Sequence, residues 1–259
     1  MKGGLRTIKI KPEIIQYIKE APNSAYDSLA IEFMYHNNDL ENLGYTHKEI
    51  QEIVQELKLS GSHGVYETYM VLNMKDVFDY MIDTLGKPIH GDMLLSMHSI
   101  LADKTKEDHQ GFKGCWKKLP NGIMGSDITF VEPEDVEREL QKLLERWNAS
   151  EKTMDDIIDF HIQFEYIHPY AFGNGIIGRL LMLKQCIEQE HDLIIIDGKH
   201  YGDYMQGLYV AQMLGDASQL KEMIPICQKE MEGRLSALAH TVDSIDWNRV
   251  LNDEICMKV

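Results

Sequence analysis

The chain has 259 residues, of which 44% are hydrophobic and 26% charged, and it carries a net charge of −16. This length and composition predict a globular protein that buries a sizeable core. The negative charge disfavours nucleic acid and anionic membranes as partners, because binding to either relies on lysine and arginine to neutralise phosphate.

Helical periodicity dominates the first hundred residues. Apolar residues recur at intervals of three and four, and prolines, glycines or polar clusters separate the segments. Thr46 is followed three residues later by Glu49, the pattern of a capping box at the start of a helix. The expected helices cover residues 12–20, 25–38, 47–58, 65–85 and 90–102.

Residues 103–132 contain the only long stretch without helical periodicity, and glycines punctuate it. Within it, segments 116–121 and 128–131 resemble two short strands around a turn. We therefore expect one small β-hairpin in this part of the chain, although an ordinary surface hairpin has the same appearance.

The helical pattern then returns and continues to the end of the sequence. One exception is the apolar run at residues 193–196, which predicts a buried extended segment. The expected helices cover residues 132–147, 151–167, 176–190, 200–214, 216–239 and 243–251. With no repeat and no low-complexity linker, the pattern predicts an all-α fold in one continuous domain over residues 1–259. Its N-terminal helices lie within residues 1–60 and its C-terminal helices within residues 216–259.

The cysteines are scattered and form no Cys-x-x-Cys pair, so neither a disulfide framework nor a metal site is expected from them. No apolar run approaches the roughly 20 residues of a membrane span. Residues 1–10 lack the apolar stretch of a signal peptide. We expect a cytoplasmic protein without membrane association. A bacterial effector exported without a cleaved signal fits the same features.

Chemistry is expected at residues 168–179, which read HPYAFGNGIIGR. A loop with Gly173 and Gly175 leads into a helix, and the unpaired N–H groups at a helix N-terminus bind anions. Arg179 follows four residues after Gly175, and helical side chains lean toward the N-terminus, so its guanidinium can reach the same anion. Together with His168, these residues indicate phosphate chemistry beside a base. An ordinary loop before a core helix is the competing interpretation.

This stretch resembles the signature of the Fic (Fido) domain family, His-Pro-Phe-x-Asp/Glu-Gly-Asn-Gly-Arg-x-x-Arg. The resemblance continues upstream through residues 159–167 and downstream through Leu180 and Leu181. Two positions depart, because Phe172 replaces the acidic residue and Ile176 the first arginine. The resemblance implies a Fic-type helical bundle with its core at residues 61–215. It also implies that the hairpin, at about residues 119–131, is a flap that docks a target protein by strand addition.

The resemblance further implies a protein adenylyltransferase, which transfers AMP from ATP to a Ser, Thr or Tyr hydroxyl of a protein. His168 would be the general base that takes the hydroxyl proton. Gly173, Asn174 and Gly175 would hold phosphates through their backbone N–H groups and the amide of Asn174. Arg179 would bind a bridging or terminal phosphate. ATP is thus the implied substrate and an unknown protein the implied partner, while homo-oligomerisation is left open.

The two departures concern the charges around the phosphates. In the family the acidic signature residue holds magnesium, and Phe172 cannot bind a hard cation. Each lost charge contact would cost roughly two to three decades in rate. Three interpretations follow: a weakened adenylyltransferase, a Fic-fold enzyme with another phosphate-containing donor, and an inactive nucleotide-binding or protein-interaction module. Restoring Phe172→Asp together with Ile176→Arg is expected to recover activity if only those side chains are lacking.

Residues 37–49 resemble the inhibitory motif of many Fic proteins, Ser/Thr-x-x-x-Glu-Gly/Asn followed by Leu-Thr-x-x-Glu. Asn37 stands in place of the Ser/Thr, and Glu41 matches the glutamate. In the family this glutamate pairs with the second signature arginine and blocks the productive nucleotide pose, so Glu41 is expected to pair with Arg179. Glu32 follows a serine at the same spacing and is the alternative inhibitory glutamate.

Overall fold

The computed structural model describes residues 11–21, 24–122 and 127–243, and the side chains of residues 20 and 232–243 lie outside the description. Within these ranges the chain is mainly helical and forms no strand. No helix in this part of the chain has both the length and the apolar character to cross a membrane. The predicted mainly helical architecture is therefore confirmed, and the predicted strands are not formed.

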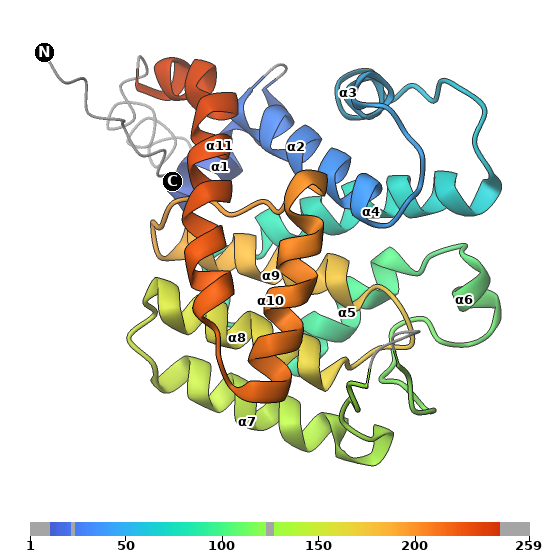
Figure 1. The fold of residues 1–259 in the computed structure, drawn as a ribbon. Helices are drawn as coiled ribbons and strands as arrows, with labels where there is room; N and C mark the ends of the chain where they lie inside the picture. The colour runs from blue at the N-terminus through green and yellow to red at the C-terminus, as the bar shows by residue number, and fades with distance from the viewer. Residues whose placement is uncertain (1–10, 22–23, 123–126, 244–259) are drawn as a thin grey trace, which may run out of the picture.

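The helices follow one another along the chain, joined mostly by short loops (Figure 1). The α-helices are α1 (Pro12–Tyr17), α2 (Ala25–Leu40), α3 (His47–Glu56), α4 (Val65–Asp83), α5 (Gly91–Leu101), α6 (Lys106–His109), α7 (Val136–Ala149), α8 (Met154–Ile167), α9 (Asn174–Glu188), α10 (Tyr201–Leu214) and α11 (Ser218–Asp243). Three short 3-10 helices are η1 (Ile18–Glu20), η2 (Pro133–Asp135) and η3 (Gly198–His200).

Most helix ends follow local sequence signals. The predicted capping box is present at α3. The Thr46 side chain accepts a hydrogen bond from the Glu49 N–H, and the Glu49 side chain accepts one from the Thr46 N–H. Thr153 and Asp156 form a second capping box at α8. The four-residue helix α6 lies inside the stretch predicted to lack helices. The helix predicted at residues 243–251 lies beyond the described residues except for its first position.

Helix α9 is the centre of the fold. Of its 15 residues, 13 are buried, because α4, α8 and neighbouring elements pack against it (Figure 1). Even Lys184 is completely buried, with its ammonium group donating to the Thr84 carbonyl and to Glu188, each at 2.6 Å. The N-terminus of α9, which carries the signature loop, is therefore fixed by the core behind it.

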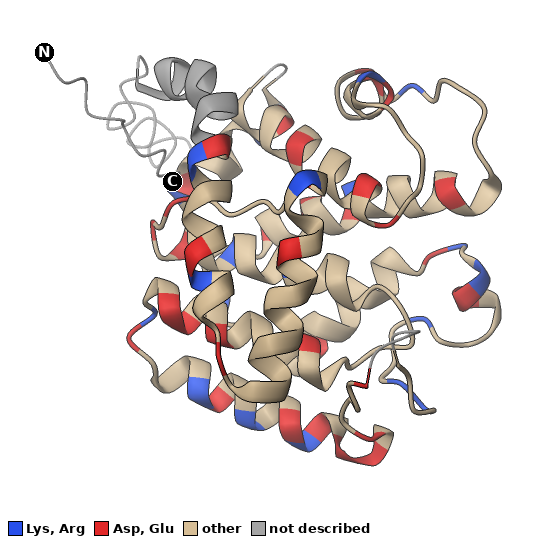
Figure 2. Ribbon diagram, viewed as in Figure 1, with Lys and Arg blue, Asp and Glu red and all other residues tan. Residues whose placement is uncertain are grey.

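Helices α7 and α8 form a pair at one edge of the fold (Figure 1). Figure 2 shows acidic and basic residues alternating along α7. Two of these residues, Glu139 and Lys142, form an exposed ion pair at 2.8 Å. The apolar side of α7 packs on α8 through Leu140, Leu143 and Trp147. Helix α7 therefore covers one side of α8, the helix that leads to the signature histidine.

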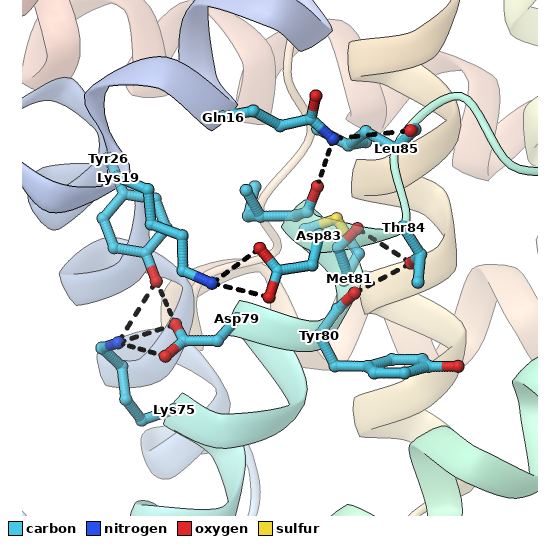
Figure 3. A network of polar contacts seen from close by, with 11 residues as sticks. Gln16, Lys19, Tyr26, Lys75, Asp79, Tyr80, Met81, Asp83, Thr84 and Leu85 are labelled. Atoms are coloured by element: carbon cyan, nitrogen blue, oxygen red, sulfur yellow. Dashed lines mark hydrogen bonds and ion pairs between the residues drawn. The ribbon is translucent and has the colours of Figure 1, made fainter. Parts of the chain in front are cut away.

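A polar network fastens the N-terminal helices to α4 (Figure 3). The Tyr26 hydroxyl of α2 donates to Asp79, and Lys75 pairs with the same carboxylate at 2.7 Å. Lys19 of η1 donates to both carboxylate oxygens of Asp83, at 2.7 and 2.8 Å. Burial, reinforced by Asp79, raises the pKa of Tyr26. These contacts fix α2, which carries Asn37 and leads directly to Glu41.

The hairpin predicted at about residues 119–131 is not formed in its described part. Residues 116–121 and 128–131 have no strand pairing, and residues 123–126 lie outside the described residues. In the second segment, the Val131 N–H donates to the Tyr166 carbonyl of α8 at 3.5 Å, and the first segment bonds to the signature loop. The Lys117 N–H donates to the Pro169 carbonyl at 2.8 Å. These tertiary hydrogen bonds replace the ladder that the local sequence favours.

Candidate active site

A cavity of about 270 Å³ lies between the signature loop and α10. It gathers all five predicted catalytic and nucleotide-binding residues, together with the predicted inhibitory glutamate: His168, Gly173, Asn174, Gly175, Arg179 and Glu41. The remaining lining residues are Ile128, Phe130, Glu165, Phe172, Tyr201, Tyr204, Met205, Leu208, Tyr209 and Gln212. Residues distant in the sequence thus surround one space large enough for part of a small molecule.

Arg179 is held by two side chains at the C-terminal end of α2. Its Nη2 donates to Glu41 Oε1 at 2.8 Å, and its Nε donates to Asn37 Oδ1 at 2.8 Å. The Arg179 side chain is only 7% exposed, whereas that of Glu41 is 36% exposed. The expected contact between Glu41 and Arg179 is therefore present, and Asn37 takes part in it. Glu32, the alternative glutamate, instead contacts His47 at 3.4 Å.

Gly175 leaves room for Arg179 to fold back over the N-terminus of α9. A Cβ atom at residue 175 would lie 2.7 Å from Arg179 Nη1. Gly173 caps the helix in the left-handed conformation, with φ of 74°, and contributes no side chain to the cap. The first N–H groups of a helix have no intrahelical partner, so they can bind an anion. Backbone donors and a guanidinium are thus brought together at one point.

Asn174 stabilises the loop through its side chain. Its Oδ1 accepts from the Tyr170 N–H at 2.8 Å, and its Nδ2 donates to the Tyr170 carbonyl at 2.9 Å. The residue is 2% exposed. One hydrogen of the amide nitrogen and the backbone N–H at the start of α9 remain available to an anion. That the amide itself holds phosphate stays a prediction.

His168 follows the last residue of α8 and has a positive φ of 48°. Its Nδ1 lies 3.3 Å from the Glu165 carbonyl oxygen, which favours the tautomer with hydrogen on Nδ1 and a free lone pair on Nε2. The ring stacks on Phe130 with centroids 4.1 Å apart. Burial lowers the pKa of His168 to about 4, against the opposing effect of the Glu165 carbonyl. The imidazole is therefore neutral at pH 7 and can accept a proton.

The two positions that depart from the Fic signature have different surroundings. Phe172 is half-buried on the cavity wall, and its ring centroid lies 5.0 Å from that of His98. Ile176 is 0% exposed and belongs to the hydrophobic core. A change at Phe172 alters the cavity directly, whereas a change at Ile176 alters the packing behind it.

Sequence reasoning missed a buried polar cluster beneath Arg179. His161 is buried, with Nε2 2.8 Å from the Tyr204 hydroxyl. Burial lowers the pKa of His161 to about 3 and raises that of Tyr204. Glu165 is also buried, and burial raises its pKa to about 7. One signal was available, because Glu165 stands only three residues before His168, in the last turn of the helix that precedes it.

Replacing Tyr204 with phenylalanine is expected to lower the free energy of unfolding by about 1–3 kcal/mol, because the buried His161 nitrogen loses its partner. The matched control is Tyr209→Phe, since Tyr209 lies on the same helix and lines the same cavity. Urea denaturation of both variants gives the comparison. Equal destabilisation by the two changes would show that the contact with His161 contributes nothing.

Potential metal ligands gather elsewhere. In the described ranges, one group of three has its ligand atoms within 4.8 Å of one another: Asp197, His200 and Glu230. Lys199 pairs with Glu230 at 2.8 Å, and His200 Nδ1 lies 2.8 Å from Asp197. None of the three lines the cavity, where the carboxylates present are Glu41 and Glu165. The side chain of Phe172 contains no oxygen, so position 172 provides no oxygen ligand at the signature loop.

Residues 88–186 match the model of the Fic/DOC family. The chain contains a Fic domain. A probable protein adenylyltransferase from Aquifex aeolicus is 26% identical over 152 residues, which cover 54% of this chain and 44% of the relative. A protein adenylyltransferase Fic from Nematostella vectensis is 25% identical over 205 residues, which cover 74% of this chain and 44% of that protein. The chain thus aligns with less than half the length of either relative.

Solved Fic structures share the arrangement of helices. A Fic domain containing signaling protein from Bacteroides thetaiotaomicron superposes with a TM-score of 0.72 at 16% identity, covering 91% of this chain and 98% of that one. Fic-1 from C. elegans superposes with a TM-score of 0.70 at 17% identity, covering 89% and 71%. The Fic-type helical fold predicted from the signature is therefore confirmed, while the strands of the flap are not seen in the described residues.

Proposed function

We propose that this Fic domain is a protein adenylyltransferase whose activity is weakened or redirected by Phe172 and Ile176. The observation that carries the proposal is that a neutral His168, the N-terminus of α9 and Arg179 line one cavity. A base beside a set of phosphate-binding donors is what transfer of a nucleotide to a hydroxyl requires. The adenylyltransferase names of the relatives from Aquifex aeolicus and Nematostella vectensis agree with this reaction.

ATP has phosphates and a planar base, and the cavity has a group of donors and an apolar wall that suit them. The donors of α9 and Arg179 suit phosphates, while α10 contributes Tyr201, Met205 and Leu208, an apolar and aromatic wall of the kind that packs against a planar base. Magnesium does not fit the residues at the signature, because Phe172 stands where the acidic ligand would be and offers no oxygen. The chain therefore binds the phosphates through nitrogen donors.

His168 would begin the transfer by taking the proton of the target hydroxyl at Nε2. The hydroxyl oxygen then bonds to the α-phosphorus of ATP, and the bond from that phosphorus to the pyrophosphate oxygen breaks. Pyrophosphate leaves, and the target carries AMP as a phosphodiester. The α9 N–H groups and Arg179 would offset the charge on the phosphate oxygens, and such charge neutralisation supplies most of the rate in displacements of this kind.

Glu41 and Asn37 would inhibit the reaction by occupying Arg179. Together they engage its Nη2 and Nε atoms, the two donors that a phosphate would use in a two-pronged contact. Glu41 is the more exposed of the two and can be displaced, whereas Asn37 is 1% exposed. We therefore assign the reversible part of the inhibition to Glu41.

The protein target would dock at residues 119–131. Leu119 is 68% exposed, and Ile128 and Phe130 line the cavity next to His168. The described residues of this segment thus include an exposed side chain and two that line the cavity beside the base. Docking through its backbone would bring a target hydroxyl to His168 with little dependence on the target's side chains.

Intact mass spectrometry after incubation with ATP and magnesium or manganese tests the function. The Glu41→Gly variant is expected to modify itself, and so gain the mass of AMP, faster than the wild type, because Nη2 of Arg179 is released to bind a phosphate. The gain should disappear in Glu41→Gly/His168→Ala, since a general base contributes about 10²–10⁴ in rate.

The same assay with other nucleoside triphosphates separates the competing functions. Modification by another donor, in a reaction that still needs His168, would favour the redirected enzyme. If no donor modifies any variant while ATP still raises the melting temperature of Glu41→Gly, the adenylyltransferase proposal is wrong and the domain is a nucleotide-binding module.

A further inference from the structure

Glu165 is one of the residues that line the cavity, and its Oε1 atom is buried without a hydrogen-bond partner. The residue is 7% exposed. Its carboxyl group lies against Gly178, where a Cβ atom would come within 2.2 Å of Oε1. The glycine thus provides the space that the carboxyl group occupies. A buried polar atom without a partner is costly, so this group calls for an explanation.

The charges around Arg179 depend on whether Glu165 is ionised. Arg179 forms its ion pair with Glu41, at 2.8 Å. If both carboxylates are ionised, one guanidinium faces two negative groups, and an incoming phosphate is repelled. If Glu165 is neutral, displacement of Glu41 leaves the positive charge of Arg179 uncompensated. A neutral carboxyl group also carries a hydrogen that it can donate to a phosphate oxygen.

Burial moves the pKa values of two nearby histidines and one tyrosine away from neutral pH. It lowers the pKa of His161, on α8, to about 3 and that of His168, directly after α8, to about 4. On α10, burial raises the pKa of the Tyr204 hydroxyl. From the end of α2, Glu41 pairs with Arg179 of α9. Burial raises the pKa of Glu165 to about 7, with Arg179 opposing the shift and Glu41 reinforcing it.

We propose that Glu165 is a proton-carrying residue of the anion site, which admits a phosphate beside Arg179 when it is neutral and excludes it when it is ionised. This inference rests on the proposed nucleotide binding and adds a binding residue to it. The sign of the pH dependence follows directly. Because the anion prefers the protonated form, binding takes up a proton, and affinity falls as the pH rises through the pKa of Glu165 in the free protein.

Isothermal titration calorimetry with metal-free ATP tests the proposal between pH 6 and 8.5. The comparison uses Glu41→Gly, in which Arg179 keeps its bond to Asn37 but loses its carboxylate partner, and Glu41→Gly/Glu165→Gln, which removes the titrating group while keeping its shape. With Glu165 present, affinity is expected to fall by up to about tenfold per pH unit above pH 7. The glutamine variant should show a smaller fall and less proton uptake in buffers of different ionisation enthalpy. The ionisation of ATP itself is common to both proteins.

A ¹³C NMR titration of the glutamate carboxyls gives a second, ligand-independent readout. The Glu165 resonance is identified by its loss in Glu165→Gln. A midpoint near 4.3, the ordinary glutamate value, would overturn the proposal whatever ATP does. Identical pH profiles of ATP affinity in the two variants would overturn it as well. If neither variant binds ATP at any pH, the proposed function fails, and inorganic pyrophosphate in the same comparison decides the role of Glu165.

Discussion

Replacing Phe172 with aspartate in the Glu41→Gly protein is expected to raise the magnesium-dependent rate of AMP transfer by roughly two to three decades. Phe172 lies half-buried on the cavity wall, so a carboxylate in its place can face the cavity instead of the core. Carboxylate oxygen is a ligand that magnesium prefers, and the ion would neutralise phosphate charge in the transition state. Loss of ring packing beside His98 is expected to lower stability by about 1–3 kcal/mol.

Phe172→Asn is the matched control, because it has nearly the same shape as aspartate and carries no charge. Time courses of intact mass with magnesium and with a chelator give the rates, and melting temperatures with ATP give an independent readout of binding. Magnesium should enlarge the ATP-induced rise in melting temperature of the aspartate variant and leave the asparagine variant almost unchanged. An equal response of the two variants to magnesium would show that position 172 does not hold the metal.

The helices could be predicted because their signals are local. The helix predicted at residues 47–58 from the capping pattern of Thr46 and Glu49 spans His47–Glu56 in the structure. Apolar stripes likewise located α4, α5 and α8, to within a few residues at each end. The short helix α6 escaped prediction because four residues give too little periodicity to detect.

The strands of the flap could not be judged from local sequence. Their residues favour extended backbone. Strand pairing also requires that the two segments form hydrogen bonds with each other and not with other parts of the chain. Here the Lys117 N–H bonds to the Pro169 carbonyl, and the Asn121 side chain donates to the Tyr170 carbonyl at 2.8 Å. The signature loop is thus the partner of the first segment, and only the tertiary structure reveals it.

Long-range contacts of the site were accessible only through family resemblance. Glu41 and Arg179 are 138 residues apart, and no local pattern in either segment points to the other. Family resemblance did not point to Glu165. Its burial depends on the space that Gly178 provides on the next helix. Sequence periodicity reports which face of a helix is apolar, and it does not report where a neighbouring backbone makes room for a carboxyl group.

Ile176→Arg is expected to have the opposite outcome from Phe172→Asp, although both restore a residue of the Fic signature. Ile176 is 0% exposed within the core and does not line the cavity. A guanidinium there would be buried without a counter-charge, which costs about 3–5 kcal/mol. The melting temperature should fall by more than about 6 °C. Ile176→Met, which keeps the volume, should cost less than about 1.5 kcal/mol.

We therefore expect Phe172→Asp alone, and not its combination with Ile176→Arg, to recover activity. Thermal unfolding of Ile176→Arg, Ile176→Met and the wild type decides the matter before any activity is measured. If Ile176→Arg melts within a degree or two of Ile176→Met, the arginine has found a way out of the core into the cavity, and position 176 is again able to bind a phosphate. If it melts far below, the packing behind α9 has adapted to isoleucine, because a buried apolar neighbourhood cannot solvate a charge. Ile176 stands in place of the first signature arginine. The positive charge that this arginine would place beside a phosphate must then come from another residue or from the target protein.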